Sequence, residues 1–176
     1  MNVVAYVAVG SNLQPEANIP AALERLLSFV RVTASSTFYR TAALRRPGDP
    51  EFLNGVWQIE TPLNARALKF SVLRGIENEL GRIRGVDRYA PRTLDLDLLV
   101  YGEAAINEPG LRVPDPDIRS RPFLAAPLLE LSAGLVLADT GETLAGVWRG
   151  RLGPEAGEPL VADRGMTEQL RERIRR

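Results

Sequence analysis

Two aspartates, Asp95 and Asp97, stand at the start of an otherwise apolar segment, DLDLLVY, at residues 95–101. Alternate residues of a β-strand point to the same face, so both carboxylates are expected to leave one side of a sheet. They would repel each other without a cation between them, and Mg²⁺ commonly binds one or two carboxylates together with substrate phosphates. The pair therefore predicts a metal site; the alternative is a solvated strand face that carries two acidic residues.

Arginines crowd the segment just before these aspartates. Residues 66–92 carry seven basic and three acidic side chains, whereas residues 93–117 carry one basic and six acidic side chains. Guanidinium forks match phosphate oxygens, and a loop with Gly85 and Pro91 can bring them over a bound polyphosphate. Carboxylates for a metal beside several arginines are the parts of a phosphoryl-transfer site. Two solvated faces of opposite charge are the alternative.

The composition excludes several kinds of chemistry. The 176 residues contain no cysteine and no histidine, which rules out disulfides, a Ser-His-Asp triad, a histidine-ligated zinc and an imidazole base. The formal net charge is zero, so no overall field favours nucleic acid or a membrane as a partner. The start MNVVAYVAVGSN lacks the basic region of a signal peptide, and we expect a cytoplasmic protein.

Four strands and two helices are expected in the first hundred residues. Apolar and alternating patterns predict strands at 3–9, 31–40, 52–61 and 95–101. Helical spacing predicts one helix over 19–30 after a possible N-cap at Asn18, and a second from Asn64 to Leu80 with Gly81 past its end. The order β-α-β-β-α-β is the ferredoxin-like plan, an α+β fold with helices on one face of an antiparallel sheet.

The rest of the chain is less regular. A proline-rich loop precedes an expected helix near residues 123–131, and hairpin-like pieces follow at 135–147. Residues 150–165 have the composition of a linker, and Met166, Leu170 and Ile174 share one face of a short basic helix. We expect one domain over 1–150 and a C-terminal extension over 151–176. The extension is expected to be loosely docked or disordered, with a dimer contact as the alternative.

The segment Arg88-Tyr-Ala-Pro-Arg92-Thr-Leu-Asp95-Leu-Asp97-Leu-Leu resembles the signature of the 6-hydroxymethyl-7,8-dihydropterin pyrophosphokinases, enzymes of folate synthesis. Further segments match in order at 5–13, 38–41, 52–54, 113–114 and 121–123, so the resemblance covers about residues 1–145. It implies a ferredoxin-like fold, in agreement with the pattern of elements. It also implies transfer of the β,γ-pyrophosphoryl group of ATP to the pterin's hydroxymethyl oxygen, with release of AMP.

The resemblance implies roles for individual residues. The catalytic set is Arg82, Arg92, Asp95 and Asp97, of which the two aspartates resemble the ligands of two Mg²⁺ ions. The ATP-binding set, extended by residues close to the signature, is Glu77, Arg84, Arg88, Tyr89, Arg92, Arg112 and Arg121. The pterin-binding set is Thr41, Leu44, Phe52, Asn54 and Phe123. Loops 41–51 and 82–94 resemble mobile lids that close over both substrates.

Several positions depart from the family pattern. Asp115 stands where the family usually has histidine, Tyr89 replaces a common tryptophan, and Ala42 replaces a proline. Gly110 takes the place of a frequent basic residue, although Arg112 follows closely. A carboxylate near a triphosphate would be repelled by it. We therefore expect Asp115 to pair with Arg112 or Arg119.

Two other functions are compatible with parts of the pattern. A nucleotidyl transferase on a ferredoxin-like palm also places metal-binding carboxylates on strands, but its leaving group is pyrophosphate instead of AMP. A non-catalytic, RNA-binding ferredoxin-like module needs exposed aromatic rings on the sheet and a basic face. The zero net charge and the two aspartates on the sheet argue against that module.

Overall fold

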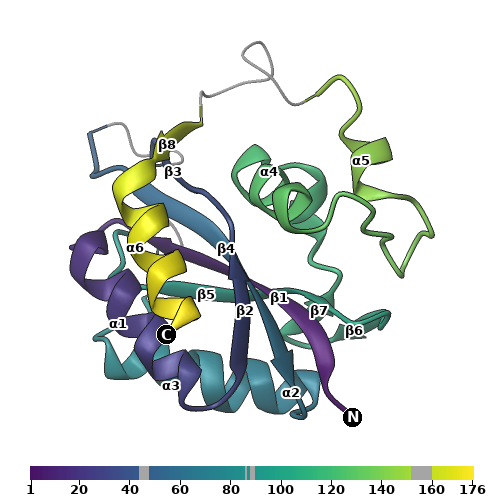
Figure 1. Ribbon diagram of the computed structural model, residues 1–176, viewed down its shortest axis with the longest axis horizontal. Coiled ribbons are helices and arrows are strands. Elements are labelled where there is room, and N and C mark those ends of the chain that lie inside the picture. The colour runs from purple at the N-terminus through teal and green to yellow at the C-terminus, as the bar shows by residue number, and fades with distance from the viewer. Residues whose placement is uncertain (44–47, 86, 88–89, 152–159) are drawn as a thin grey trace.

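An antiparallel sheet forms the middle layer of the computed structural model, which describes residues 1–43, 48–85, 87, 90–151 and 160–176 (Figure 1). Its strands are β1 (Val3–Ser11), β2 (Arg31–Ser35), β3 (Phe38–Thr41), β4 (Phe52–Thr61), β5 (Asp95–Tyr101) and β8 (Val161–Asp163). They lie in the order β5-β1-β4-β3-β8, and β2 also pairs with β4. The first five strands and the helices between them have the expected ferredoxin-like arrangement, and the α+β class is confirmed.

The strand expected over 31–40 is divided into β2 and β3. Both pieces pair with β4, with Val32 opposite Ile59 and Arg40 opposite Leu53. Ser36 lies between the pieces: its backbone N–H donates to the carbonyl of Val56, and its hydroxyl accepts from the N–H of Val56. A side chain that takes a ladder hydrogen bond interrupts the regular pairing, so the strand breaks at this serine.

The first helix, α1 (Pro15–Leu27), begins earlier than expected. Its N-cap is Gln14, which has a left-handed φ of 48°, and Pro15 occupies the first turn. Asn18 lies inside the helix and donates from its side chain to the carbonyl of Leu13 at 2.6 Å. The prediction of Asn18 as N-cap was therefore wrong, because a proline at the first helical position starts the helix without a side-chain cap.

The second helical stretch confirms both of its predicted ends. It consists of α2 (Ala65–Ala67), η1 (Leu68–Leu73) and α3 (Arg74–Glu79). The side chain of Asn64 caps it by accepting from the N–H of Ala67 at 2.8 Å, and Gly81 follows with a φ of 77°. The middle part, η1, has the wider turns of a π-helix, an irregularity that is frequent at functional sites.

Both faces of the sheet are covered, so the expectation of helices on one face was incomplete. Ala5, Val7 and Val9 of β1 point into the main core with α1, η1, α3 and the C-terminal helix α6 (Arg164–Arg175). Tyr6 and Ala8 point into a second core under α4 (Pro122–Leu131) and α5 (Leu144–Val147). Figure 1 shows α4 and α5 on the opposite side of the sheet from α1 and α3.

Between β5 and α4 the chain forms a hairpin of β6 (Ile106–Glu108) and β7 (Leu111–Val113), which the sequence did not predict. A single turn, η2 (Pro116–Arg119), then leads to α4, which begins one residue before its expected start. The hairpin-like pieces after α4 are reduced to one bridge, between Val136 and Thr143.

The C-terminal extension is docked on the sheet over residues 160–176. Strand β8 pairs with β3, and Met166 and Leu170 of α6 are buried in the main core. The expectation of a loosely docked or disordered tail was wrong for these residues, because their apolar stripe packs onto the sheet. Residues 152–159 lie outside the described residues, and the domain boundary near 150 stays a prediction. Among the described residues, no helix has the length and apolarity needed to cross a membrane.

Candidate active site

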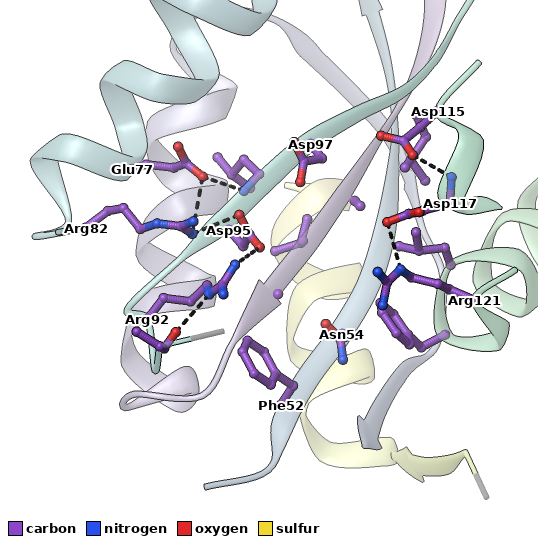
Figure 2. A pocket seen from close by; sticks show the side chains of 18 of the residues that line it. Phe52, Asn54, Glu77, Arg82, Arg92, Asp95, Asp97, Asp115, Asp117 and Arg121 are labelled. Carbon is purple, nitrogen blue, oxygen red and sulfur yellow. Dashed lines mark hydrogen bonds and ion pairs between the residues drawn. The ribbon is translucent and has the colours of Figure 1, made fainter. Parts of the chain in front are cut away.

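A cavity of about 480 Å³ opens beside the ends of β1, β4 and β5. Figure 2 shows Glu77, Arg82, Arg92 and Asp95 along one side of it, Asp115, Asp117 and Arg121 on the other, and Phe52 and Asn54 at one end. A cavity of this size accommodates small-molecule substrates. The cavity therefore has two environments: charged walls that suit an anion and an aromatic end that suits a flat ring.

Asp95 is held between two arginines at the start of β5. Its carboxylate accepts from Arg82 Nη1 at 2.8 Å and from Arg92 Nη1 at 2.7 Å. Only 10% of the Arg82 side chain and 15% of the Arg92 side chain are exposed, so these charge-assisted contacts are shielded from bulk water. The two arginines and the aspartate predicted as catalytic residues thus form one cluster.

Asp97 also lines the cavity, as strand alternation predicted, but its partner was not foreseen. Lys69 Nζ lies 3.6 Å from Asp97 Oδ1, and only 14% of the Lys69 side chain is exposed. The Asp97 side chain is 48% exposed, toward the cavity. Its pKa is nevertheless raised, because desolvation and the charge of Asp95 outweigh the lowering effect of Lys69. Lys69 is the only lysine in a chain rich in arginine. This unusual lysine was the one feature of the sequence that could have drawn attention to position 69.

Glu77 is almost fully buried on α3, where it connects the helix to β5. It accepts from the backbone N–H of Leu96 at 2.9 Å and forms ion pairs with Arg84 and, at 3.7 Å, with Arg82 Nη1. Burial raises the pKa of Glu77, because the hydrogen bond from Leu96 and the two arginines offset only part of the desolvation. Its contacts orient the arginines; an ATP-binding role for Glu77 stays a prediction.

Asn12, in the turn after β1, joins two loops that border the cavity. Its side-chain oxygen accepts from the N–H of Arg92 at 2.8 Å, and its amide donates to the carbonyl of Pro50 at 3.1 Å. The Arg92 guanidinium also lies 5.7 Å from the centre of the Phe52 ring. Sequence reasoning did not single out Asn12, although the Gly10-Ser-Asn turn at a strand end marked its position.

The opposite wall differs from the expectation for Asp115. Its carboxylate accepts from the N–H of Asp117 at 2.8 Å and caps η2, while Arg119 pairs with Asp139 at 2.5 Å. The predicted pairing with Arg112 or Arg119 was therefore wrong: the Asp115 carboxylate accepts from a backbone donor two residues away, and Arg119 pairs with another aspartate. Burial, followed by the charges of Asp97 and Asp117, raises the pKa of Asp115.

The aromatic end of the cavity contains the described residues predicted to bind pterin. Asn54 Nδ2 donates to Thr41 Oγ1 at 2.8 Å, and both residues are buried. A Cβ on Gly10 would lie 2.7 Å from Asn54 Oδ1, so a glycine is needed there. Phe52 and Phe123 line the same cavity, with the Arg121 guanidinium 5.9 Å from the centre of the Phe123 ring.

Most of the predicted site residues come together, and among the described ones only Arg112 does not. Leu44, Arg88 and Tyr89 lie outside the described residues. Arg112 is exposed on β7 and is not among the residues that line the cavity. The roles given to these four residues, and to the two expected lids, stay predictions. The remaining predicted residues all line the cavity: Thr41, Phe52, Asn54, Glu77, Arg82, Arg84, Arg92, Asp95, Asp97, Arg121 and Phe123.

Comparison with known proteins decides which family this site represents. The family model described as 7,8-dihydro-6-hydroxymethylpterin-pyrophosphokinase matches residues 6–133, from β1 to the turn after α4. The chain belongs to this pyrophosphokinase family. The resemblance of residues 88–99 to its signature is thereby confirmed, and the matched segment contains every residue that lines the cavity.

Curated relatives of the pyrophosphokinase family support the assignment over most of the chain. A protein of Haemophilus influenzae is 39% identical over 141 residues, which cover 78% of this chain and 87% of the relative. A Pseudomonas aeruginosa protein is 41% identical over 137 residues, 76% of this chain and 83% of the relative. A Bacillus subtilis protein is 36% identical over 160 residues, 87% of this chain and 95% of the relative. All three are named 2-amino-4-hydroxy-6-hydroxymethyldihydropteridine pyrophosphokinase.

Proposed function

We propose that this chain transfers the pyrophosphoryl group of ATP to the hydroxymethyl group of 6-hydroxymethyl-7,8-dihydropterin and releases AMP, as a step of folate synthesis. The observation that carries the proposal is that the family match spans every lining residue of one cavity. The pterin hydroxyl oxygen forms a bond to the β-phosphorus, the bond between that phosphorus and the α-phosphate oxygen breaks, and the hydroxyl proton is released.

The arginine-rich wall binds the triphosphate in this proposal. Arg84 lines the cavity; Arg82 and Arg92 lie along one side of it, and Arg121, the N-cap of α4, lies on the other, so cations approach the substrate from two sides. Arg82 and Arg92 already have their guanidinium groups ordered by Asp95. Pre-ordered donors stabilise charge that develops in the transition state without the cost of reorganisation.

Asp95 and Asp97 fit a Mg²⁺ site. They are carboxylates two residues apart on one strand, and the pKa of Asp97 is raised first by desolvation and then by the nearby charge of Asp95. Within the described residues, no cluster of three or more acidic, histidine or cysteine side chains could by itself hold a metal. Substrate phosphates would supply further oxygen ligands, as is usual for Mg²⁺. Bound there, Mg²⁺ would neutralise phosphate charge as a Lewis acid.

The aromatic end binds the pterin. Phe52 and Phe123 offer flat apolar surfaces to the bicyclic ring, and Asn54 offers a carboxamide whose orientation is fixed by Thr41. The close approach of Gly10 restricts the Asn54 side chain further. A carboxamide with a fixed orientation can discriminate the donor and acceptor groups along the edge of a pterin.

The test is a product assay. Purified protein with ATP, Mg²⁺ and the reduced hydroxymethylpterin should form AMP in equal amount to the pterin diphosphate. Asp97→Asn should lower turnover by at least 100-fold, since a neutral amide removes metal-directed charge, whereas Glu142→Gln, an exposed residue away from the cavity, should not. Release of pyrophosphate would instead support the nucleotidyl-transferase alternative, and absence of any nucleotide turnover by the wild type would contradict the proposal.

A further inference from the structure

Strand β3 carries a pterin-site residue but is only four residues long. Its last residue, Thr41, supplies the hydroxyl that orients Asn54. On one side β3 pairs with β4 through Tyr39, Arg40 and Thr41. On its other side the C-terminal strand β8 pairs with it, with Phe38 opposite Asp163 and Arg40 opposite Val161. Without β8, this short strand would be the edge of the sheet.

Side chains of the extension hold the same strand. Arg40 donates to Asp163 Oδ2 from Nε at 3.0 Å and from Nη2 at 2.7 Å, and Nη2 also reaches Glu16 Oε1 at 3.1 Å. The N–H of Phe38 donates to Thr167 Oγ1 at 2.9 Å, and that hydroxyl donates to the carbonyl of Asp163 at 2.7 Å. Phe38 and Arg40 of β3 are thereby tied to residues at the start of α6.

The extension is itself anchored in the main core, so it can transmit this restraint. Met166 and Leu170 are buried there together with Phe38. The Phe38 ring occupies the space beside Gly55, where an added Cβ would lie 2.5 Å from the ring. Gly55 directly follows Asn54 on β4, so the packing of Phe38 and the position of Asn54 are linked through adjacent residues.

We propose that residues 161–175 are a positioning element for the pterin half of the active site. They hold β3 in place, and β3 in turn holds Thr41 against Asn54. The assignment of Thr41 and Asn54 to pterin rests on the proposed function. Lys69, Asp95 and three of the arginines proposed to bind the triphosphate come from other elements, namely η1, β5 and the segment between α3 and β5. The fourth arginine, Arg121, is the N-cap of α4 and is not part of β3. Loosening the extension therefore weakens pterin binding and leaves ATP binding unchanged.

The variant that isolates this effect is Thr167→Val, which removes the acceptor for the Phe38 N–H at nearly constant side-chain volume. We expect the KM for the pterin to rise about three- to tenfold, the range for loss of one buried hydrogen bond, with ATP affinity within twofold of wild type. Thr167→Ser keeps the hydroxyl and is the matched control, expected to behave as wild type. Equal changes for both substrates, or no change for the pterin, would overturn the proposal.

Hydrogen exchange provides a measurement that does not depend on the reaction. In Thr167→Val, the amides of residues 38–41 should exchange faster than in wild type, while those of β5 keep their protection. Unchanged exchange in β3 overturns the proposal, and so does faster exchange with an unchanged pterin KM. If wild type forms no AMP, the proposed function fails on its own, whereas the exchange result still reports on the link between the extension and β3.

Discussion

At the scale of single residues, the cavity is organised by charge pairs that the substrates must rearrange. Asp95 has two guanidinium partners and Asp97 has an ammonium partner, Lys69. In the proposed reaction, the phosphates of ATP would compete for these cations, and Mg²⁺ would compete for the carboxylates. The cavity therefore contains internal counterions, so that Asp95 and Asp97 each lie beside a cation of the protein itself.

Substitution of Lys69, the cationic partner of Asp97, tests whether this charge contributes to ATP binding. Lys69→Met keeps an apolar stem of similar length and removes the charge, so ATP affinity should fall about tenfold, roughly 1.4 kcal/mol. Arg66→Met is the matched control on the same helical stretch, because Arg66 pairs with Glu108 at the surface and does not line the cavity. Calorimetric titration with ATP and Mg²⁺ measures both variants. Unchanged affinity in Lys69→Met would show that the charge of Lys69 does not contribute to ATP binding.

At the scale of elements, the site depends on close packing between neighbouring strands. Gly10 lies opposite both Asn54 of β4 and Asp95 of β5, so one residue of β1 separates the aromatic end from the acidic side of the cavity. Asn12, two residues on, contacts the segments before β4 and before β5. The end of β1 is thus the common support of both halves of the site.

Substitution of Gly10 tests this support. In Gly10→Ala the new Cβ would lie 2.7 Å from Asn54 Oδ1, so the amide must move and its bond to Thr41 weakens. We expect a free energy of unfolding lower by about 1–3 kcal/mol and weaker pterin binding. Gly75→Ala on α3 is the control: its Cβ meets no atom within 4 Å, and it should stabilise the helix by up to about 1 kcal/mol. Urea unfolding and pterin titration of both variants would show whether the two glycines differ.

At the scale of the whole molecule, the C-terminal extension connects the sheet to helices on both of its faces. Arg40 connects Glu16 of α1 to Asp163 at the start of α6, and Arg173 pairs with Glu24 of α1. Arg171 pairs with Glu130 of α4, on the other face of the sheet. These contacts couple the stability of the extension to the rest of the fold and make part of it dependent on pH.

Asp163 is one residue that makes the free energy of unfolding depend on pH. The hydrogen bond from the N–H of Met166, and next the contacts with Arg40, hold the pKa of Asp163 below its usual value. A carboxylate with a lowered folded-state pKa stabilises the fold above its unfolded pKa of about 3.9, and this contribution is lost as the pH falls through the folded pKa.

The measurement compares wild type with Asp163→Asn, which can still cap α6 but carries no charge. The free energy of unfolding of the variant should be lower by up to about 1 kcal/mol at pH 7, and the difference should shrink below about pH 4. Urea unfolding at several pH values gives the free energy of unfolding of each protein as a function of pH. Subtracting one curve from the other cancels the contributions of the other titrating groups. A difference that stays constant from pH 7 to pH 3 would contradict the role of the charge.

Much of the fold could be predicted because local rules and tertiary packing agree there. Strand β4 has the predicted bounds, the predicted cap at Asn64 and glycine at Gly81 end the second helix, and Asp95 and Asp97 lie on the face of β5 that strand alternation requires. The start of α1 and the break at Ser36 were missed. In both cases a nearby hydrogen bond or proline outweighed the hydrophobic pattern.

The sequence by itself determined the class of fold, the carboxylate pair and the family, because each can be recognised from short local patterns and from their order along the chain. Tertiary structure alone decided that Lys69 neutralises Asp97, that Asp115 caps a turn instead of pairing with an arginine, and that residues 161–175 complete the sheet. These outcomes depend on which of several competing partners lies nearest in space. A charge, a cap or a strand edge has many candidates in the sequence, and packing selects one of them.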